Sequence, residues 1–69
     1  MFRPMSLFTH GNHMYVTDAG HHEVRVIDTE SREFISKFGS EYLYNPGGIT
    51  IDQDGFVYVT SHSSKIVIF

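Results

Sequence analysis

Hydrophobic residues in this chain gather in short runs that turn residues separate. The runs are rich in β-branched and aromatic side chains, which favour strands over helices. They predict strands at about residues 5–9, 14–18, 23–28, 33–38, 48–52, 56–60 and 65–69. The chain is therefore predicted to be an all-β protein of antiparallel strands.

The predicted strands form two copies of one repeat. The matched segments are residues 4–9 with 46–51, 14–17 with 57–60, and 24–27 with 66–69, and the small shifts between them fall in predicted turns. Self-similarity at a spacing of roughly 40 residues is typical of repeat folds. The first copy holds four strands, and the second copy stops before its fourth strand.

Turn residues support these boundaries. Asp54-Gly55 is a hairpin signal, and Gly11-Asn12 stands at the same point of the first copy, where glycine and asparagine both tolerate the positive φ of such a turn. Asp18-Ala19-Gly20 predicts a turn in which the aspartate accepts hydrogen bonds from nearby backbone N–H groups. Asn45-Pro46-Gly47-Gly48 marks the passage to the second copy, because proline cannot continue a central strand.

The strands are apolar on both faces. Met14-Tyr15-Val16 and Ile66-Val67-Ile68-Phe69 lack the alternation of a sheet with one face in water. Such strands are covered on both sides. Four-stranded antiparallel units that repeat in this way, each between neighbours of the same kind, describe the blades of a β-propeller.

The chain resembles the NHL-repeat family of β-propellers on residues 15–27, 34–39 and 46–60, and the absence of tryptophan separates it from WD-type repeats. The family's Asn-His-Leu-like stretch appears as His21-His22-Glu23-Val24. In the second copy this stretch is shortened to residues 61–66, without the turn aspartate and glycine. The resemblance implies one blade at about 4–39, a connector at 40–46 and a partial blade at about 47–69, whereas such propellers usually carry about six blades.

A chain of 69 residues without cysteine has few means of stabilising a small core by itself. Two blades also leave apolar faces and open strand edges, which recruit further strands. We therefore expect the chain to self-associate, three copies giving six blades, or to be part of a longer propeller. The absence of cysteine also fits a cytoplasmic location.

The charge pattern bears on partners. The net charge is −3, and the five Lys and Arg residues are scattered singly. Because a surface that follows nucleic-acid phosphates needs a basic stripe, single-stranded RNA binding is an alternative that the charge disfavours. No sustained apolar stretch follows Met1 to Met5, so neither a secretory signal nor a membrane span is expected.

The loops are predicted to fall at two ends of the blades. Residues 9–13, 28–33 and 52–55 share an acidic end, and residues 18–23, 39–48 and 61–65 share the other. The candidate partner-binding residues lie at this second end and are His21, His22, Glu23, Tyr42, Tyr44 and His62. Tyrosines on rigid loops favour interfaces, so we expect a non-catalytic scaffold that recognises a protein partner. Packing of the tyrosines against the neighbouring blade is the alternative.

No catalytic motif is found in the sequence. Nucleophile elbows, phosphate-binding glycine loops and paired acid–base carboxylates are absent, and Asp52 and Asp54 are interpreted as turn residues. His21, His22 and His62 could share a zinc ion, as in the similar propeller of the peptide-amidating lyase. That chemistry needs histidines from several blades, and no carboxylate–histidine spacing of metal type supports it. Neither a metal nor a cofactor is expected.

Overall fold

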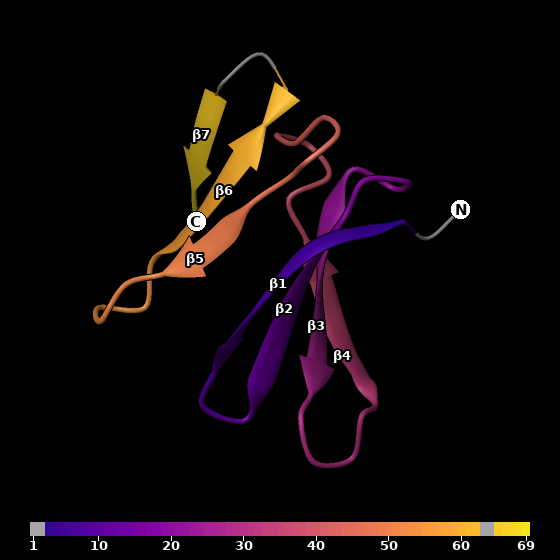
Figure 1. Ribbon diagram of the computed structural model, residues 1–69, viewed down its shortest axis with the longest axis vertical. Helices are drawn as coiled ribbons and strands as arrows, with labels where there is room; N and C mark the ends of the chain where they lie inside the picture. The colour runs from indigo at the N-terminus through magenta and orange to yellow at the C-terminus, as the bar shows by residue number, and fades with distance from the viewer. Residues whose placement is uncertain (1–2, 63–64) are drawn as a thin grey trace.

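The computed structural model describes residues 3–62 and 65–69, which form two antiparallel sheets and no α-helix (Figure 1). The strand order is β1–β2–β3–β4 in the first sheet and β5–β6–β7 in the second. The bounds are β1 Pro4–His10, β2 His13–Asp18, β3 Glu23–Asp28, β4 Phe34–Phe38, β5 Ile49–Ile51, β6 Val57–Ser61 and β7 Lys65–Ile68. The predicted all-β class and strands are confirmed, with ends that differ by at most one residue. The expectation for the extreme N-terminus falls on Met1 and Phe2, and that for the shortened second-copy loop includes residues 63–64; both pairs lie outside the described residues.

The turns between strands largely form as predicted. Gly55 has a φ of 89° and Gly11 a φ of 62°. Asn12 does not have a positive φ. In this turn Gly11 is the residue in the left-handed region. The Asp52 carboxylate accepts hydrogen bonds from the backbone N–H groups of Asp54 and Phe56 at 2.9 and 3.0 Å, so Asp52 holds a turn, as expected.

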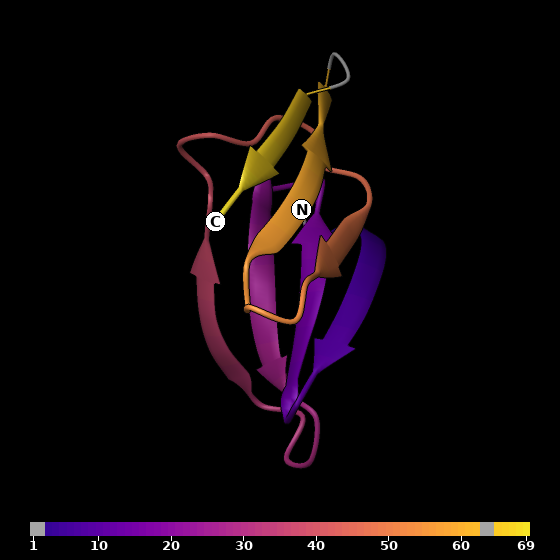
Figure 2. The same ribbon diagram turned by 90° about the vertical axis from the view of Figure 1, so that its left-hand side faces the viewer.

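The core lies between the two sheets. β5 lies beside β1 and β2, and Figure 2 shows the second sheet lying over the first. The buried cluster draws on both sheets and on the segment between them, and consists of Val24, Leu43, Ile49, Ile51, Val57 and Val59, with Phe8, Tyr15, Phe38, Val67 and Phe69 packed against it. The alternate residues of β5 and β6 therefore point to the first sheet.

The segment between β4 and β5, residues 39–48, extends the predicted connector at both ends, is called the connector from here on, and is tied to this core. Leu43 is buried in the cluster, and its backbone N–H and that of Tyr42 both donate to the Gly39 carbonyl at 2.9 Å. The Phe69 ring lies edge-to-face on Phe38 at 4.9 Å. The connector thus folds back over the end of β4 and over Phe69, the residue that follows β7.

Each sheet keeps one face that the other sheet does not cover. Leu7 on β1 is 58% exposed and Ile66 on β7 is 65% exposed. The strands are therefore apolar on both faces, as predicted, while the described residues cover only one face of each sheet. Residues 3–62 and 65–69 contain no helix long and apolar enough to cross a membrane.

Candidate binding surface at the loop end

Three segments far apart in the sequence meet at the upper end of the molecule in Figure 1. They are the β2–β3 turn (residues 19–22), the connector and residues 61–62, and we call this region the loop end. The Asn45 N–H donates to Nδ1 of His22 at 2.8 Å, and the His62 N–H donates to the Tyr44 carbonyl at 2.9 Å. The Ser61 hydroxyl oxygen also accepts from the Tyr44 N–H at 2.9 Å. The loop end is therefore held by hydrogen bonds between its segments.

One aromatic ring from each segment joins a contact that we call the histidine–tyrosine cluster: His22, Tyr44 and His62. The His22 and Tyr44 rings stack at 4.8 Å with 7° between their planes. The His62 ring stands edge-on to Tyr44 at 5.4 Å. Tyr44 remains 61% exposed, so the cluster forms part of the surface although its rings already contact one another.

His22 also has a structural role in the turn. Its φ is 56°, a left-handed conformation that is uncommon for residues other than glycine. Its Nδ1 accepts the hydrogen bond from Asn45 and so carries no proton in this arrangement. His22 therefore joins the β2–β3 turn to the connector.

Asp18 ends β2 and is fully buried. Its Oδ1 accepts hydrogen bonds from the backbone N–H groups of Arg3, Gly20 and His21, at 2.9, 3.0 and 3.3 Å. Burial by itself raises the pKa of this carboxyl, but these hydrogen bonds and the His21 ring outweigh burial and lower the pKa to about 2. The prediction that Asp18 accepts backbone hydrogen bonds in its turn is confirmed.

Nitrogen atoms of two side chains contact the other oxygen of Asp18. Nδ1 of His21 lies 2.7 Å from Oδ2, and Nε of Arg25 lies 3.1 Å from the same atom. The same Nε lies 3.0 Å from Oε2 of Glu23. We call Asp18, His21, Glu23 and Arg25 the Asp18 cluster.

The Asp18 cluster corrects one expectation from the sequence. Asp18, His21 and Glu23 each offer a ligand atom, and these atoms lie within 4.8 Å of one another, so a carboxylate–histidine group of metal-site dimensions does occur. The tight turn after β2 brings these residues together. The Arg25 guanidinium lies between the two carboxylates and supplies the positive charge that a cation would bring.

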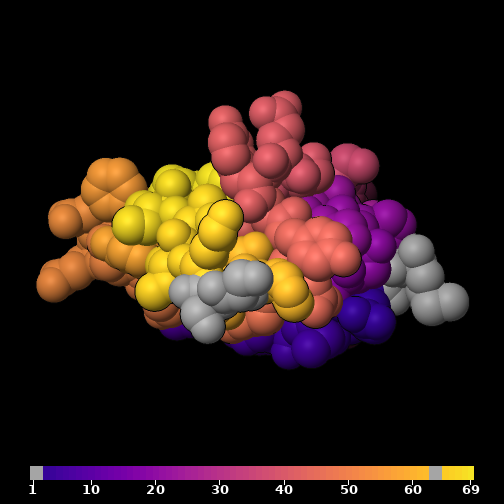
Figure 3. All heavy atoms as spheres, turned by 90° about the horizontal axis from the view of Figure 1, so that it is seen from above, coloured from indigo at the N-terminus to yellow at the C-terminus, as the bar shows by residue number. Residues whose placement is uncertain are grey.

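Tyr42 lies apart from both clusters. Its ring is 68% exposed and has an edge contact with Phe69 at 6.2 Å. Figure 3, which looks onto the loop end, shows the connector standing out between the β2–β3 turn and the strands of the second sheet. The six predicted residues thus share one end but form three groups: the histidine–tyrosine cluster, His21 with Glu23, and Tyr42 alone.

The sequence that forms these sheets and loops matches a known protein family. Residues 31–65 match a family model described as the SBBP β-propeller repeat. The chain belongs to this family. Comparison with curated protein sequences gives no match. The four-stranded sheet and the three-stranded sheet are accordingly called the first and second blades, and the matched segment runs through β4, the connector, β5 and β6.

The sequence did not indicate every residue that shapes this blade end. Arg25 interrupts an apolar strand, and this interruption was the available signal for its role between the carboxylates. Asn45 was assigned to the turn, but its backbone bond to His22 depends on the fold. Ser61 carried no signal, because its hydrogen bonds with the Tyr44 backbone continue the pairing of β5 and β6 into the connector, an extension that the sequence does not show.

Proposed function

We propose that this β-propeller segment is a non-catalytic scaffold that binds a protein partner at the loop end. The observation that carries the proposal is the histidine–tyrosine cluster, in which the exposed Tyr44 and His62 rings and the half-buried His22 ring stand on segments already joined by hydrogen bonds. Aromatic rings on a preorganised surface offer contact area with little entropy to lose on binding. Such a surface favours recognition over chemistry.

We further infer that the blades are of the NHL type. Support comes from His22, which stands in the family's Asn-His-Leu-like stretch and links its own turn to the connector of the next blade. The buried Asp18 carboxylate orders the same turn. Both residues belong to the first blade, which has the turn aspartate and glycine that the second copy lacks.

Two other activities compete with protein recognition. A zinc site of the lyase kind is disfavoured because Nδ1 of His22 is engaged by Asn45 and Arg25 already pairs with the Asp18 and Glu23 carboxylates. Single-stranded RNA binding would draw on the exposed rings, but it lacks a basic stripe to accompany them. Zinc analysis of the purified chain and a salt-dependent gel shift with single-stranded RNA separate these activities from protein recognition.

A random peptide library displayed on phage tests the proposal directly. Peptides selected on the 69-residue chain are expected to bind Tyr44→Ala at least tenfold more weakly, because Tyr44 is the central ring of the cluster. Gln53→Ala lies in the turn at the opposite end and should bind them with unchanged affinity. Affinities are measured by biolayer interferometry on purified variants.

The result that would overturn the proposal is equally concrete. Selected peptides that bind Tyr44→Ala and the parent chain alike would place the binding surface elsewhere. Loss of binding in Gln53→Ala as well would mean that the peptides respond to a general change in the fold. Circular dichroism of both variants checks that the strands are retained.

A further inference from the structure

The contact between the two blades is directional. The first blade contributes one face, with Phe8, Tyr15 and Val24, to the shared core. The second blade contributes the residues that alternate the other way in the repeat, namely Ile49, Val59 and Val67. Two different faces of the repeat therefore meet. The contact is thus asymmetric: the face that the first blade buries is the one that the second blade leaves uncovered.

Equivalent residues show that both uncovered faces are copies of covered ones. Leu7 occupies the repeat position of Ile49, yet Leu7 is 58% exposed and Ile49 is 9% exposed. Ile66 occupies the position of Val24, yet Ile66 is 65% exposed and Val24 is fully buried. The uncovered face of the first blade thus has the positions that the second blade buries, and the reverse holds for the second blade.

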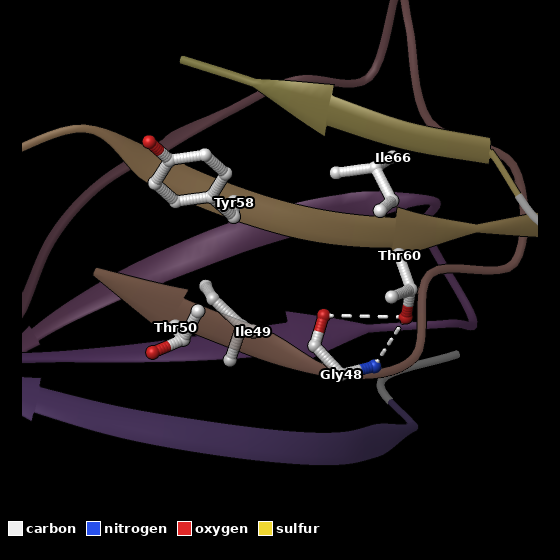
Figure 4. Close-up of a pocket in the computed structure, with 6 residues that line it drawn as sticks. All are labelled: Gly48, Ile49, Thr50, Tyr58, Thr60 and Ile66. Atoms are coloured by element: carbon white, nitrogen blue, oxygen red, sulfur yellow. Dashed lines mark hydrogen bonds between the residues drawn. The ribbon is translucent and has the colours of Figure 1, made fainter. Parts of the chain in front are cut away.

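A threonine hydroxyl marks the same relation. Thr17 accepts a hydrogen bond from the Ser6 N–H at 3.0 Å and donates across the blade contact to the Gly47 carbonyl at 2.7 Å. Thr60 has the repeat position of Thr17 and accepts the equivalent bond from the Gly48 N–H at 2.7 Å, drawn in Figure 4. In the repeat, the acceptor that corresponds to Gly47 is Met5. In the single chain the Thr60 hydroxyl donates to the Gly48 carbonyl at 3.4 Å, as Thr17 does to the Ser6 carbonyl at 3.3 Å, and the Met5 carbonyl of another copy would supply the further acceptor that Gly47 supplies to Thr17.

Both uncovered faces are hollowed where this contact would form. A hollow of about 420 Å³ on the second blade is lined by Gly48, Ile49, Thr50, Tyr58, Thr60 and Ile66 (Figure 4). A second hollow, of about 330 Å³, lies on the first blade and is lined by Pro4, Met5, Ser6, Leu7 and Val16. Met5 has a long flexible side chain where Gly47 has none, and such a side chain fills irregular apolar gaps.

We infer that a second copy of this chain docks head-to-tail, with the uncovered face of its first blade against the uncovered face of the second blade of its neighbour. The new contact repeats the one inside the chain, with Thr60 and Met5 in the roles of Thr17 and Gly47. A head-to-tail contact continues into a ring or an open filament instead of ending at a symmetric pair. This inference is independent of the loop end and of what binds there.

Complementary variants test the head-to-tail contact. Leu7→Asp disables the first-blade face and Ile66→Asp the second-blade face, and both positions are exposed in the single chain. Light scattering is expected to show the parent chain as multiples of its 7.9 kDa mass and each variant alone as a monomer. An equimolar mixture should form a one-to-one pair, because each variant retains the face that the other lacks. Gln53→Asp adds the same charge in a turn and should assemble like the parent.

Two outcomes would overturn the inference: a parent chain that stays monomeric at every concentration, or monomeric variants that do not pair when mixed. Cysteine pairing gives a second measurement that does not depend on the aspartate variants folding, since the chain has no cysteine of its own. Oxidation of mixed Met5→Cys and Thr60→Cys chains should give the mixed disulfide dimer above its random share. The pair Met5→Cys with Gln53→Cys should give only the random share, and equal yields would also contradict the contact. Peptide binding at the loop end is scored separately, so either proposal can fail alone.

Discussion

Gly39 is held by two separate constraints. Its φ is 90°, a conformation that residues with a side chain rarely adopt, and a Cβ at this position would lie 2.9 Å from both Leu43 Cδ1 and Phe69 Cζ. Gly55 has nearly the same φ, 89°, but open space around its Cα. A side chain at Gly55 would meet backbone strain alone, whereas a side chain at Gly39 would meet the same strain and a steric clash.

We expect Gly39→Ala to lower the free energy of unfolding more than Gly55→Ala. Gly55→Ala should cost about 1 kcal/mol through strain alone, and Gly39→Ala should cost roughly 1–3 kcal/mol more because the connector must shift. Urea denaturation at one fixed protein concentration measures both. Equal losses in the two variants would show that the connector adapts without cost.

Asp18 makes stability depend on acidity. Its pKa is lowered from 3.8 to about 2 in the folded chain, so the folded state favours the ionised carboxylate more than the unfolded state does. This contribution is complete above the unfolded pKa of 3.8 and is lost as the pH falls toward 2. Hydrogen bonds from the backbone of Ser31 and Glu30 also lower the pKa of Asp28, and the Tyr58 hydroxyl, with backbone N–H groups of the turn, lowers that of Asp52, which adds to the trend.

The melting temperature of the parent chain should therefore fall between pH 4 and pH 2 more steeply than that of Asp18→Asn, as followed by circular dichroism. Asp18→Asn should start lower at neutral pH, because an amide cannot pair ionically with Arg25. Parallel curves for the two proteins over this range would show that Asp18 has an ordinary pKa.

At the scale of elements, the connector is the part of the chain that joins the blades. Leu43 is its apolar anchor in the shared core, whereas Glu41 is exposed two residues earlier. Leu43→Ala is expected to lower the free energy of unfolding by roughly 2–4 kcal/mol. Glu41→Ala should change it by less than about 0.5 kcal/mol. Chemical denaturation of both compares them; a small loss at Leu43 would mean that the connector does not hold the blades together.

The elements followed from the sequence because strand periodicity and turn residues act locally. Asp18-Ala19-Gly20 and Asp54-Gly55 carry their turn chemistry within a few residues, so their conformations could be predicted. The connector was recognised from Asn45-Pro46, but its fold depends on the Leu43 side chain reaching a core made by both blades. The pattern of residues in the connector itself does not show that Leu43 packs against residues of both blades.

The candidate site shows the same division. The sequence placed His22, Tyr44 and His62 at one end, but not the ring contacts between them, which arise when residues 22, 44 and 62 are brought together by packing of the blades. The Asp18 cluster was missed because Arg25 approaches it from the neighbouring strand. Sequence spacing gives the end of a blade on which a residue lies, and tertiary packing decides its partners.

At the scale of the whole molecule, each of the two blades leaves one of its faces uncovered, with large apolar side chains such as Leu7 and Ile66 exposed on it. Burial of apolar area supplies most of the stability of a small domain, and large side chains such as Leu7 and Ile66 contribute little of it in the single chain. Association through these faces would add that contribution and would favour the folded chain by mass action.

The difference between Met5 and Gly47 has a geometric outcome. Any assembly of whole chains would alternate two kinds of joint, one with a bare backbone at the position of Gly47 and one with a thioether side chain at that of Met5. Its true period would then be two blades, so a closed six-blade ring of three chains would have threefold and never sixfold symmetry.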